Sequence, residues 1–544
     1  MKKLTIKILI VSLAIVVPTT SLRAQMATMD EALIVASNWI EIVMYNKGAW
    51  GNFDQAYVEE IQDFNREGRV IGYFCQVYPQ GFIVISLRKE LAPVKAYSAT
   101  SDLDPTSEKG LVDVIKGGME RVLDAVEQEV GPIEAATSQQ VQNVLEINYR
   151  PAWEEMEVDL NILEERLKSA GIEMNYQEGE VLLSTAWDQG DPYNRLCPTG
   201  DTGCTDCCPD DPWTCNPTQP TLVGCVATAG SQIMKHWNWP PYGVTNHSYT
   251  WDGDDSCNGP VGGEIRSATF SDTYDWVRMA NRYIWDAWQD RWEDEDGNPL
   301  AQANLNAMAE LCYEVGVAVN MDYGVCGSGA FTDDMENVYE THYRYSTDCA
   351  RRNRDDYSAV GWFNLMKANF DVNRPVHYKI SGHSIVSDGW QEVIINQVLT
   401  KQYHMNYGWG EIGTCQTGCN TWYTLDAHLW YDYDEDYLLE NIYPKQALGK
   451  SLVGNYPPVQ LFPYRYFDRD ATGDSVTFQP GQHLQFLRGI KVTCTSTTGN
   501  YIRFQGTSSN NIRLFSIKAT RSASIKIIDD GALRLYQNGS LKFH

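Results

Sequence analysis

Basic side chains are scarce in this sequence: 43 Lys and Arg stand against 71 Asp and Glu, and the formal net charge is −28. So acidic a chain has no electrostatic footprint for a phosphate backbone, and we expect no nucleic-acid partner. Beyond the N-terminal segment, no stretch approaches the roughly 18 apolar residues of a membrane-spanning helix, so we expect no transmembrane segment in the mature protein. The sequence also lacks helical repeats and long low-complexity tracts.

Cysteine is abundant, with 14 residues, too many for an ordinary reduced cytosolic enzyme unless several of them bind metal. The N-terminus indicates an oxidising compartment. Lys2 and Lys3 precede an apolar run from Ile8 to Val17, and Ala24 offers the small residue that signal peptidase requires. The pattern predicts a cleaved signal peptide over residues 1–24; the alternative is an uncleaved anchor. We therefore expect a secreted protein, extracellular, periplasmic or on the cell surface.

The segment after the signal peptide has the pattern of a mixed domain. Thr28 and Glu31 form a capping box, which predicts the start of an amphipathic helix. Two β-rich runs, 70–78 and 82–87, flank a Pro-Gln-Gly turn and predict a hairpin. Residues 110–167 are helical in character. The expected core-facing residues of the first helix are Leu33, Ala36, Ile40 and Val43.

Composition changes twice further along the chain. Between residues 185 and about 443 the sequence is dense in Trp, Gly, Cys and Asn. From residue 452 it becomes short alternating stretches separated by turns, which is typical of β-structure. The length allows two to four domains at roughly 150 residues each. We predict domains at 25–175, 176–445 and 446–544, the last of them an all-β module. The tail strands are expected near 476–478, 501–504, 512–517, 525–528 and 533–536, and Asn538-Gly539 fits a hairpin turn.

A candidate nucleophile lies in the run from Gly224 to Lys235, where helix-favouring residues follow Cys225. A cysteine at a helix N-terminus faces unpaired N–H groups and the positive end of the helix dipole, which favour the thiolate. The thiolate is the nucleophilic form. The competing interpretation is a buried structural cysteine or half of a disulfide.

A thiolate nucleophile needs a base. His383 follows a glycine at the expected mouth of a strand, and Asn406 lies on a second strand that ends in glycines and aromatics. The Asn406 side-chain carbonyl could accept the imidazole N–H, and Trp409 could shield that hydrogen bond from water. We expect three other histidines to have structural rather than catalytic roles: His236, His377 and His404.

Acyl transfer also needs donors that face the developing oxyanion. The backbone N–H of Cys225 supplies one. A side-chain amide near the start of the domain should supply the other, and the run from Trp187 to Asn194 contains Gln189.

Together these motifs resemble, in order, those of the streptopain family of papain-like cysteine peptidases. The resemblance rests on Trp187-Asp188-Gln189-Gly190, Gly224 to Lys235, Ala307 to Leu311 with Met321 to Gly324, Gly382-His383, and Asn406 to Gly410. It implies an α+β papain-like catalytic domain. Cys225 would be the nucleophile, His383 the general base and acid, Gln189 the oxyanion donor and Asn406 the residue that orients His383. Ser328 and Gly382, with Trp409 beside them, would bind the substrate.

The resemblance further implies an endopeptidase that acts through a thioester acyl-enzyme and favours an apolar residue before the cleaved one. It also implies a zymogen, whose segment 25–175 would be an inhibitory propeptide and partner of the enzyme. This chain departs from the family pattern at Tyr407, where the family has Trp, in the order Lys235-His236-Trp237, and at Gly230-Ser231. None of these changes removes a group that the chemistry needs.

Two other functions fit the same residues. One is a cysteine acyltransferase or amidase on the same scaffold. The other is an adhesive or carbohydrate-binding protein whose peptidase domain is degenerate. Analysis of the products distinguishes an acyltransferase or amidase from a peptidase. Activity on casein distinguishes a peptidase from an adhesive protein with a degenerate peptidase domain.

Cysteine spacing suggests disulfides rather than a metal site. Five cysteines crowd the loop before the nucleophile run, and an exported loop with little core of its own favours disulfides. The rival is a zinc knot, but the loop contains no His. The five are Cys197, Cys204, Cys207, Cys208 and Cys215, and Cys415 could pair with Cys419. Residues 468–474 only weakly resemble a calcium loop. We expect no metal and no cofactor.

Overall fold

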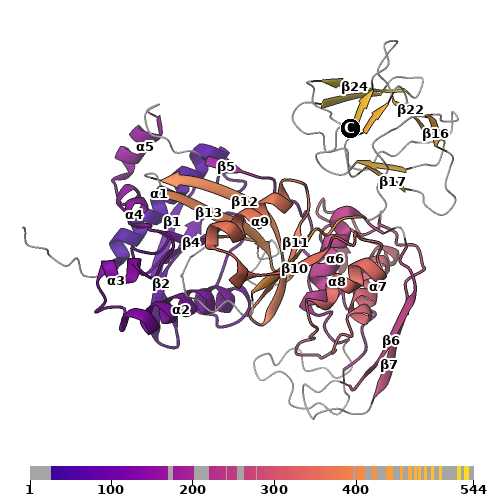
Figure 1. Ribbon diagram of the computed structural model, residues 1–544, viewed down its shortest axis with the longest axis horizontal. Helices are drawn as coiled ribbons and strands as arrows, with labels where there is room; N and C mark the ends of the chain where they lie inside the picture. Colours follow the sequence, from indigo (N-terminus) through magenta and orange to yellow (C-terminus); the bar gives the residue numbers. More distant parts are fainter. Residues whose placement is uncertain are drawn as a thin grey trace, which may run out of the picture.

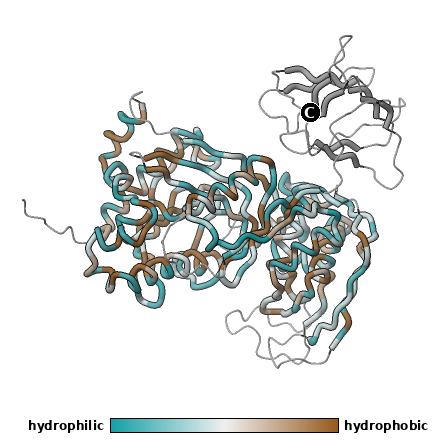
Figure 2. Tube along the Cα trace, in the orientation of Figure 1, coloured by the Kyte–Doolittle hydropathy of each residue, from teal (hydrophilic) through white to brown (hydrophobic). Residues whose placement is uncertain are grey.

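The computed structural model describes residues 26–168, 176–200, 220–240, 242–253, 263–276, 278–395, 398–410, 420–424 and 436–444, and nine strands between residues 454 and 537. Helices and strands are mixed through both larger parts, so the expected α+β class is confirmed (Figure 1). We call residues 26–168 the N-terminal part and residues 176–444 the central part. In Figure 2 hydrophobic segments alternate with hydrophilic ones along both parts.

The N-terminal part is a four-stranded antiparallel sheet with helices against it. Its elements are α1 (Met29–Lys47), β1 (Tyr57–Arg66), β2 (Arg69–Tyr78), β3 (Phe82–Ser86), β4 (Val94–Ser98), α2 (Gly110–Val130), α3 (Ser138–Gln142), α4 (Arg150–Met156) and α5 (Leu160–Lys168). The capping box of Thr28 and Glu31 and the β2–β3 hairpin are confirmed. The predicted face of α1 is wrong at Leu33, which is 37% exposed. The helix buries Ala32 and Val35 instead.

The central part combines a group of helices with the strands of a second half-sheet. Its elements are β5 (Tyr176–Glu178), α6 (Cys225–Trp237), β6 (Asn246–Trp251), β7 (Glu264–Thr269), β8 (Ile284–Asp286), β9 (Arg291–Glu293), α7 (Gln302–Ala318), α8 (Asp334–Thr341), β10 (Ala350–Asn353), η1 (Arg354–Asp356), α9 (Ala359–Phe370), β11 (Val376–Ile380), β12 (His383–Ile395), β13 (Val398–Asn406), β14 (Thr421–Thr424) and β15 (Tyr437–Glu440). Figure 1 shows α6, α7 and α8 grouped beside the end of the sheet. The helix predicted to begin at Cys225 is confirmed.

One sheet runs through both parts. Its order is β1-β2-β3-β4-β14-β13-β12-β11-β15-β10, and β5 pairs with β12 off this path. The two halves join where β4 pairs antiparallel with β14, with Tyr97 opposite Trp422 and Ala96 opposite Tyr423. In Figure 1 the orange strands of the central part therefore continue the indigo sheet. The N-terminal part is bound to the central part by backbone hydrogen bonds as well as by side-chain packing.

Buried polar contacts reinforce the junction. Gln391 on β12 donates from Nε2 to the hydroxyl oxygen of Tyr97 on β4 at 2.9 Å, and both side chains are buried. Further away, the backbone N–H of Ala359, the first residue of α9, donates to the carboxylate of Glu146 at 2.9 Å. Glu146 thus satisfies one of the unpaired N–H groups of a helix that belongs to the other part.

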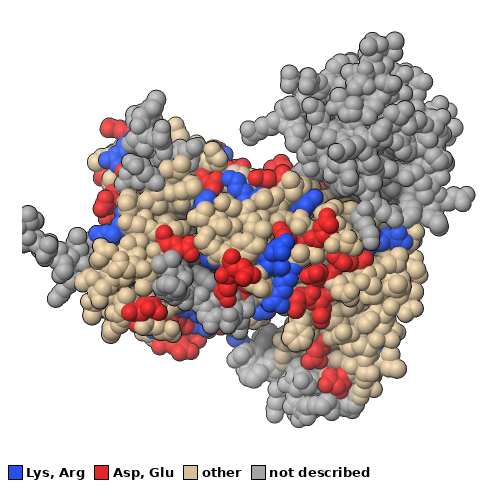
Figure 3. Space-filling model, in the orientation of Figure 1, with Lys and Arg blue, Asp and Glu red and all other residues tan. Residues whose placement is uncertain are grey.

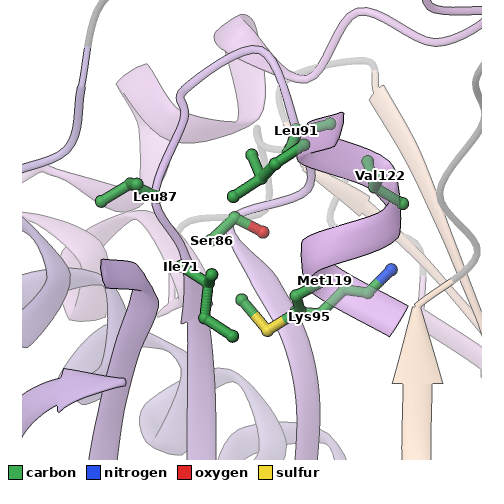
Figure 4. Close-up of a pocket in the computed structure, with 8 residues that line it drawn as sticks. Ile71, Ser86, Leu87, Leu91, Lys95, Met119 and Val122 are labelled. Atoms are coloured by element: carbon green, nitrogen blue, oxygen red, sulfur yellow. The ribbon is translucent and has the colours of Figure 1, made fainter. Parts of the chain in front are cut away.

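A small cavity lies in the N-terminal part between the sheet and α2, with room for about one water molecule (Figure 4). Its lining is mostly apolar; Ser86 and Lys95 are the polar members. Lys95 is almost fully buried, and its ammonium group lies 4.4 Å from the ring centroid of Tyr423 on β14. The core of this part therefore contains a cation that also contacts the central part.

Figure 3 shows blue and red side chains adjoining near the middle of a face that is otherwise mostly tan. On β10, Arg351 pairs with Asp333 at 3.0 Å and Arg352 pairs with Glu440 at 2.6 Å. β10 is the last strand of the sheet order, and Glu440 lies on its neighbour β15, so the second ion pair links these two strands.

The cysteines correct one expectation. Cys197, which was expected in a disulfide, is a free and buried thiol. It lies in the core near the buried thiol of Cys312 on α7. Cys75 and Cys349 are also free and buried, whereas Cys326 is disulfide-bonded. The other expected pairings, at Cys204, Cys207, Cys208, Cys215, Cys415 and Cys419, lie outside the described residues.

Past residue 450, the residues that the structure describes are all in strands. They include a sheet of order β16-β19-β22-β24-β23 and two two-stranded sheets. The bounds are β16 (Gly454–Tyr456), β17 (Tyr464–Phe467), β18 (Ala471–Gly473), β19 (Val476–Phe478), β20 (His483–Phe486), β21 (Val492–Cys494), β22 (Ile502–Phe504), β23 (Ala523–Ile527) and β24 (Ala532–Gln537). The strand expected at 512–517, the turn at Asn538-Gly539, the calcium-like residues 468–470 and the signal peptide lie outside the described residues. The domain bounds stay a prediction.

Candidate active site

Cys225 is the first residue of α6, at the end of a sharp backbone turn. The preceding Gly224 has φ +87°, a conformation that residues with a side chain rarely adopt. The backbone N–H groups of the first turn are consequently free of helical partners. A Cβ on Gly224 would lie 3.1 Å from the backbone oxygen of Ser328, so the loop that carries Ser328 lies directly against the entry to α6.

The Cys225 thiol lies next to the residue that follows His383. Burial raises the pKa of the thiol, while the backbone N–H groups of Ser384, Val226 and Cys225 itself oppose the rise by hydrogen bonding. The charge of Lys379 on β11 lowers the pKa as well. The Ser384 contact brings the first strand residues of β12 and the N-terminus of α6 together, as the motifs predict.

His383 begins β12 and is held from two sides. Its Nε2 atom donates to the backbone carbonyl of Tyr407 at 2.8 Å. Its ring stacks on Trp409, with centroids 4.3 Å apart and planes 18° apart. Burial lowers the pKa of His383 to about 4, against the opposing effect of the Tyr407 carbonyl, and the charge of Lys379 lowers it further. In this form of the protein the imidazole is therefore neutral at pH 7.

Asn406 does not make the expected hydrogen bond to the His383 ring. It lies at the end of β13 opposite Val386, three residues and therefore about 10 Å along β12 from His383. The next residue, Tyr407, supplies the acceptor instead. Asn406 donates from Nδ2 to the Thr185 carbonyl at 2.8 Å and accepts at Oδ1 from the Gly408 N–H at 3.1 Å. The expected direct contact is thus corrected to an indirect one.

The segment that contains Gln189 packs between α6 and the Trp409 loop. The backbone carbonyl of Gln189 accepts from the Val223 N–H at 2.9 Å, two residues before Cys225. The Trp187 carbonyl accepts from the Gly410 N–H at 3.1 Å. The Gln189 side chain is partly exposed. The structure therefore brings the predicted oxyanion segment close to the predicted nucleophile.

The two residues predicted to bind substrate backbone differ in exposure. Ser328 is nearly buried, and its hydroxyl donates to the Leu222 carbonyl at 2.7 Å, so its side chain is engaged within the protein. Gly382 is exposed at φ +69°, with open space where a Cβ would stand. Only the backbone of Ser328 is thus left to bind a substrate, whereas Gly382 is open to the solvent.

Sequence reasoning missed two residues of the site, Ser384 and Gln232. Gln232 is fully buried on α6, and its side chain contacts both Trp187 and Asn406. Its position seven residues after Cys225 places it on the same helix face, which was the available signal. Among the described residues, no group of three or more His, Cys, Asp and Glu side chains could hold a metal ion.

Comparisons with known proteins agree with this geometry. Residues 187–416 match the Peptidase C10 family. This segment is similar to that streptopain-like family. Streptopain of Streptococcus pyogenes is 23% identical over 353 residues, which cover 62% of this chain and 71% of streptopain. The thiol protease/hemagglutinin PrtT of Porphyromonas gingivalis is 26% identical over 229 residues, 41% of this chain and 22% of PrtT. The protein is a cysteine peptidase.

Two solved structures are similar to this one. A prointerpain A fragment of Prevotella intermedia is 22% identical, covers 71% of this chain and 99% of that one, and gives a TM-score of 0.48. Active interpain A of the same organism is 24% identical, and the match covers 49% of this chain and 95% of interpain A. The TM-score is 0.35. Within the described residues, no helix is long and apolar enough to cross a bilayer.

Proposed function

We propose that this protein is a secreted endopeptidase, made as a zymogen, that hydrolyses polypeptides through a thioester on Cys225. The observation that carries the proposal is the meeting of two segments. Cys225 at the N-terminus of α6 contacts the backbone N–H of Ser384, and the adjacent His383 is fixed by Tyr407 and Trp409. A nucleophile beside an oriented base is the arrangement that covalent acyl transfer requires.

The acylation step begins with proton transfer. Because Nε2 of the neutral His383 ring carries the hydrogen donated to Tyr407, Nδ1 has the free lone pair and takes the thiol proton. The Cys225 sulfur then attacks the substrate carbonyl carbon, and the C=O electron pair moves to oxygen. The Cys225 N–H and the Gln189 side chain stabilise that oxyanion. When the C–N bond breaks, the leaving amine takes the proton from His383.

Deacylation uses the same groups with water. His383 takes a proton from the water as it attacks the thioester, and a second oxyanion forms. The C–S bond breaks, the sulfur keeps the electron pair and takes back a proton from His383, and the peptide leaves as a carboxylic acid. Gly382 and the Ser328 backbone bind the substrate chain beside Trp409, and Asn406 acts as a positioning residue.

The N-terminal part has the proposed role of a propeptide. Its strand β4 completes the sheet of the catalytic domain, and Glu146 binds the N-terminus of α9. A covalently attached segment is present at high effective concentration and can inhibit without intrinsically tight binding. The predicted signal peptide supports export of the precursor.

A single labelling experiment tests the proposal. The protein recovered from an expressing culture would be treated with a thiol-directed peptidase inhibitor and examined by intact mass and peptide mapping. We expect loss of the signal peptide, loss of a segment that ends near residue 175, and label on Cys225. Cleavage of casein into peptides with new carboxylates supports hydrolysis. New amide products would indicate an acyltransferase, and an unlabelled, inactive protein would indicate a degenerate domain.

A further inference from the structure

Gln232 lies where three segments of the active site meet. Its side chain is fully buried two turns along α6 from Cys225. Its Oε1 atom accepts from the backbone N–H of Trp187 at 3.1 Å. Its Nε2 atom donates to Oδ1 of Asn406 at 3.1 Å, and Nδ2 of Asn406 donates back to Oε1 at 3.2 Å. The two side-chain amides form a reciprocal pair inside the protein.

Each partner of Gln232 leads to a group that the reaction uses. Trp187 precedes Gln189 by two residues, so its backbone sets the start of the oxyanion segment. Asn406 accepts the N–H of Gly408, which closes the turn that presents the Tyr407 carbonyl to His383. The same turn rests on α6, because a Cβ on Gly408 would lie 3.6 Å from Nε2 of Gln232.

From this junction we propose that Gln232 is a positioning residue for the peptidase reaction, which aligns the nucleophile helix, the oxyanion segment and the loop that holds His383. The inference rests on the proposed roles of Cys225, His383 and Gln189. Catalysis by groups from three segments depends on their relative placement, and a shift of about 1 Å can cost about 10²-fold in rate.

This role requires a side chain of the same shape as glutamine that both accepts a hydrogen bond from Trp187 and donates one to Asn406. A glutamate at position 232 would keep the acceptor for Trp187 but, when ionised, would lack a donor for Oδ1 of Asn406. Protonation restores the donor, because a neutral carboxylic acid has one O–H group. A leucine of similar size has neither function at any pH.

The test compares Gln232→Glu, Gln232→Leu and a control, Ser231→Ala, in the full chain. Ser231 is the buried neighbour on the same helix and interacts with Cys312 on α7. Each precursor would be processed by wild-type enzyme fixed to beads and then separated from it. Active sites would be counted by iodoacetamide labelling of Cys225, and kcat and KM measured on a casein-derived peptide from pH 5 to 8.

We expect kcat per labelled site to fall about 10²-fold in both Gln232 variants at pH 7.5, with KM within about threefold. Relative to wild type, Gln232→Glu should regain activity as the pH falls, and Gln232→Leu should not. Ser231→Ala should keep kcat even if it melts at a lower temperature.

A purely structural role predicts a different result: lower melting temperatures and an unchanged kcat per labelled site. The ratio of kcat for Gln232→Glu to kcat for wild type would then not change with pH. That result would overturn the inference. If Gln232→Leu does not fold, the pH dependence of the ratio of kcat for Gln232→Glu to kcat for wild type decides between the two roles. Failure of the proposed function looks different again, because wild type itself would then neither label at Cys225 nor cleave casein.

Discussion

A side chain on Gly224 would collide with Met321: a Cβ built there lies 2.5 Å from Sδ and 2.7 Å from Cε of that methionine. The loop after α7 thus fixes how closely the chain approaches Cys225. Because Gly224 also has a conformation with φ +87°, two independent constraints require glycine at the residue before the nucleophile.

Gly224→Ala should therefore lower both stability and activity. We expect a loss of about 1–3 kcal/mol from backbone strain, and a lower kcat because the Cys225 N–H moves. Adding Met321→Ala removes the collision but not the strain and leaves a cavity at a fully buried position, so we expect no gain in stability from it. Thermal unfolding and peptide hydrolysis measure the two effects. Wild-type kcat in the single variant would contradict the role given to this backbone.

Cys225→Ala should abolish proteolysis and leave an unprocessed precursor, because the oxyanion donors then have no acyl-enzyme to stabilise. Mass spectrometry of the protein recovered from an expressing culture and a casein assay provide the measurement. Normal self-processing in this variant would show that a residue other than Cys225 is the nucleophile. Substitutions of the buried free thiols Cys75, Cys312 and Cys349 are suitable controls.

Gln189→Ala should lower kcat by roughly 10²–10³, as the loss of one oxyanion donor does in other acyl-transfer enzymes. KM should change little, since the donor acts on charge that develops in the transition state. Steady-state kinetics on a peptide separate the two constants. An effect confined to KM would instead assign Gln189 to substrate binding.

Glu146→Gln should speed self-processing of the precursor. The carboxylate binds the N–H of Ala359 at the start of α9, where a negative charge interacts favourably with the helix dipole, so its removal weakens the hold of the N-terminal part. A cap of this kind contributes about 0.5–2 kcal/mol, which predicts a several-fold change in rate. Time courses of precursor loss measure it. Glu154→Gln, at an exposed position of α4, is the control, and equal rates for the two variants would contradict the prediction.

Stability should depend on pH through Glu314 of α7. Burial raises the pKa of this carboxyl to about 7, although the hydroxyl of Tyr274 donates to it. The folded state therefore binds a proton that the unfolded state has lost between about pH 4.5 and 7, and stability falls by up to about 3 kcal/mol as the pH rises through that range. Glu314→Gln should flatten this part of the profile. Melting temperatures at pH 5 and 7.5 test it, and parallel profiles would refute it.

Local pattern was enough to predict the nucleophile helix. A helix-favouring run after glycine predicts where α6 begins, and the capping box of Thr28 and Glu31 predicts the start of α1. The predicted face of α1 is wrong at Leu33, since the helix packs with Val35 inward and Leu33 outward. Such a rotation is set by the sheet on which the helix lies rather than by its own residues.

Contacts between distant segments could not be predicted in this way. The spacing from Cys225 places Gln232 on the same face of α6, but its partners lie 45 and 174 positions away, so a local pattern does not predict its contacts. The acceptor for His383 likewise depends on the register of β12 against β13, which places Asn406 opposite Val386 and leaves Tyr407 within reach. A shift of register by one residue would have exchanged the faces of the strand.

The pairing of β4 with β14 has a consequence for the processed enzyme. If the N-terminal part is removed as proposed, the short strand Thr421–Thr424 loses the neighbour on one of its sides. Its amide and carbonyl groups there must then turn to water or to another extended chain. If maturation removes the N-terminal part as proposed, it would thus create a new sheet edge at Trp422 and Tyr423, within what is a continuous sheet in the precursor.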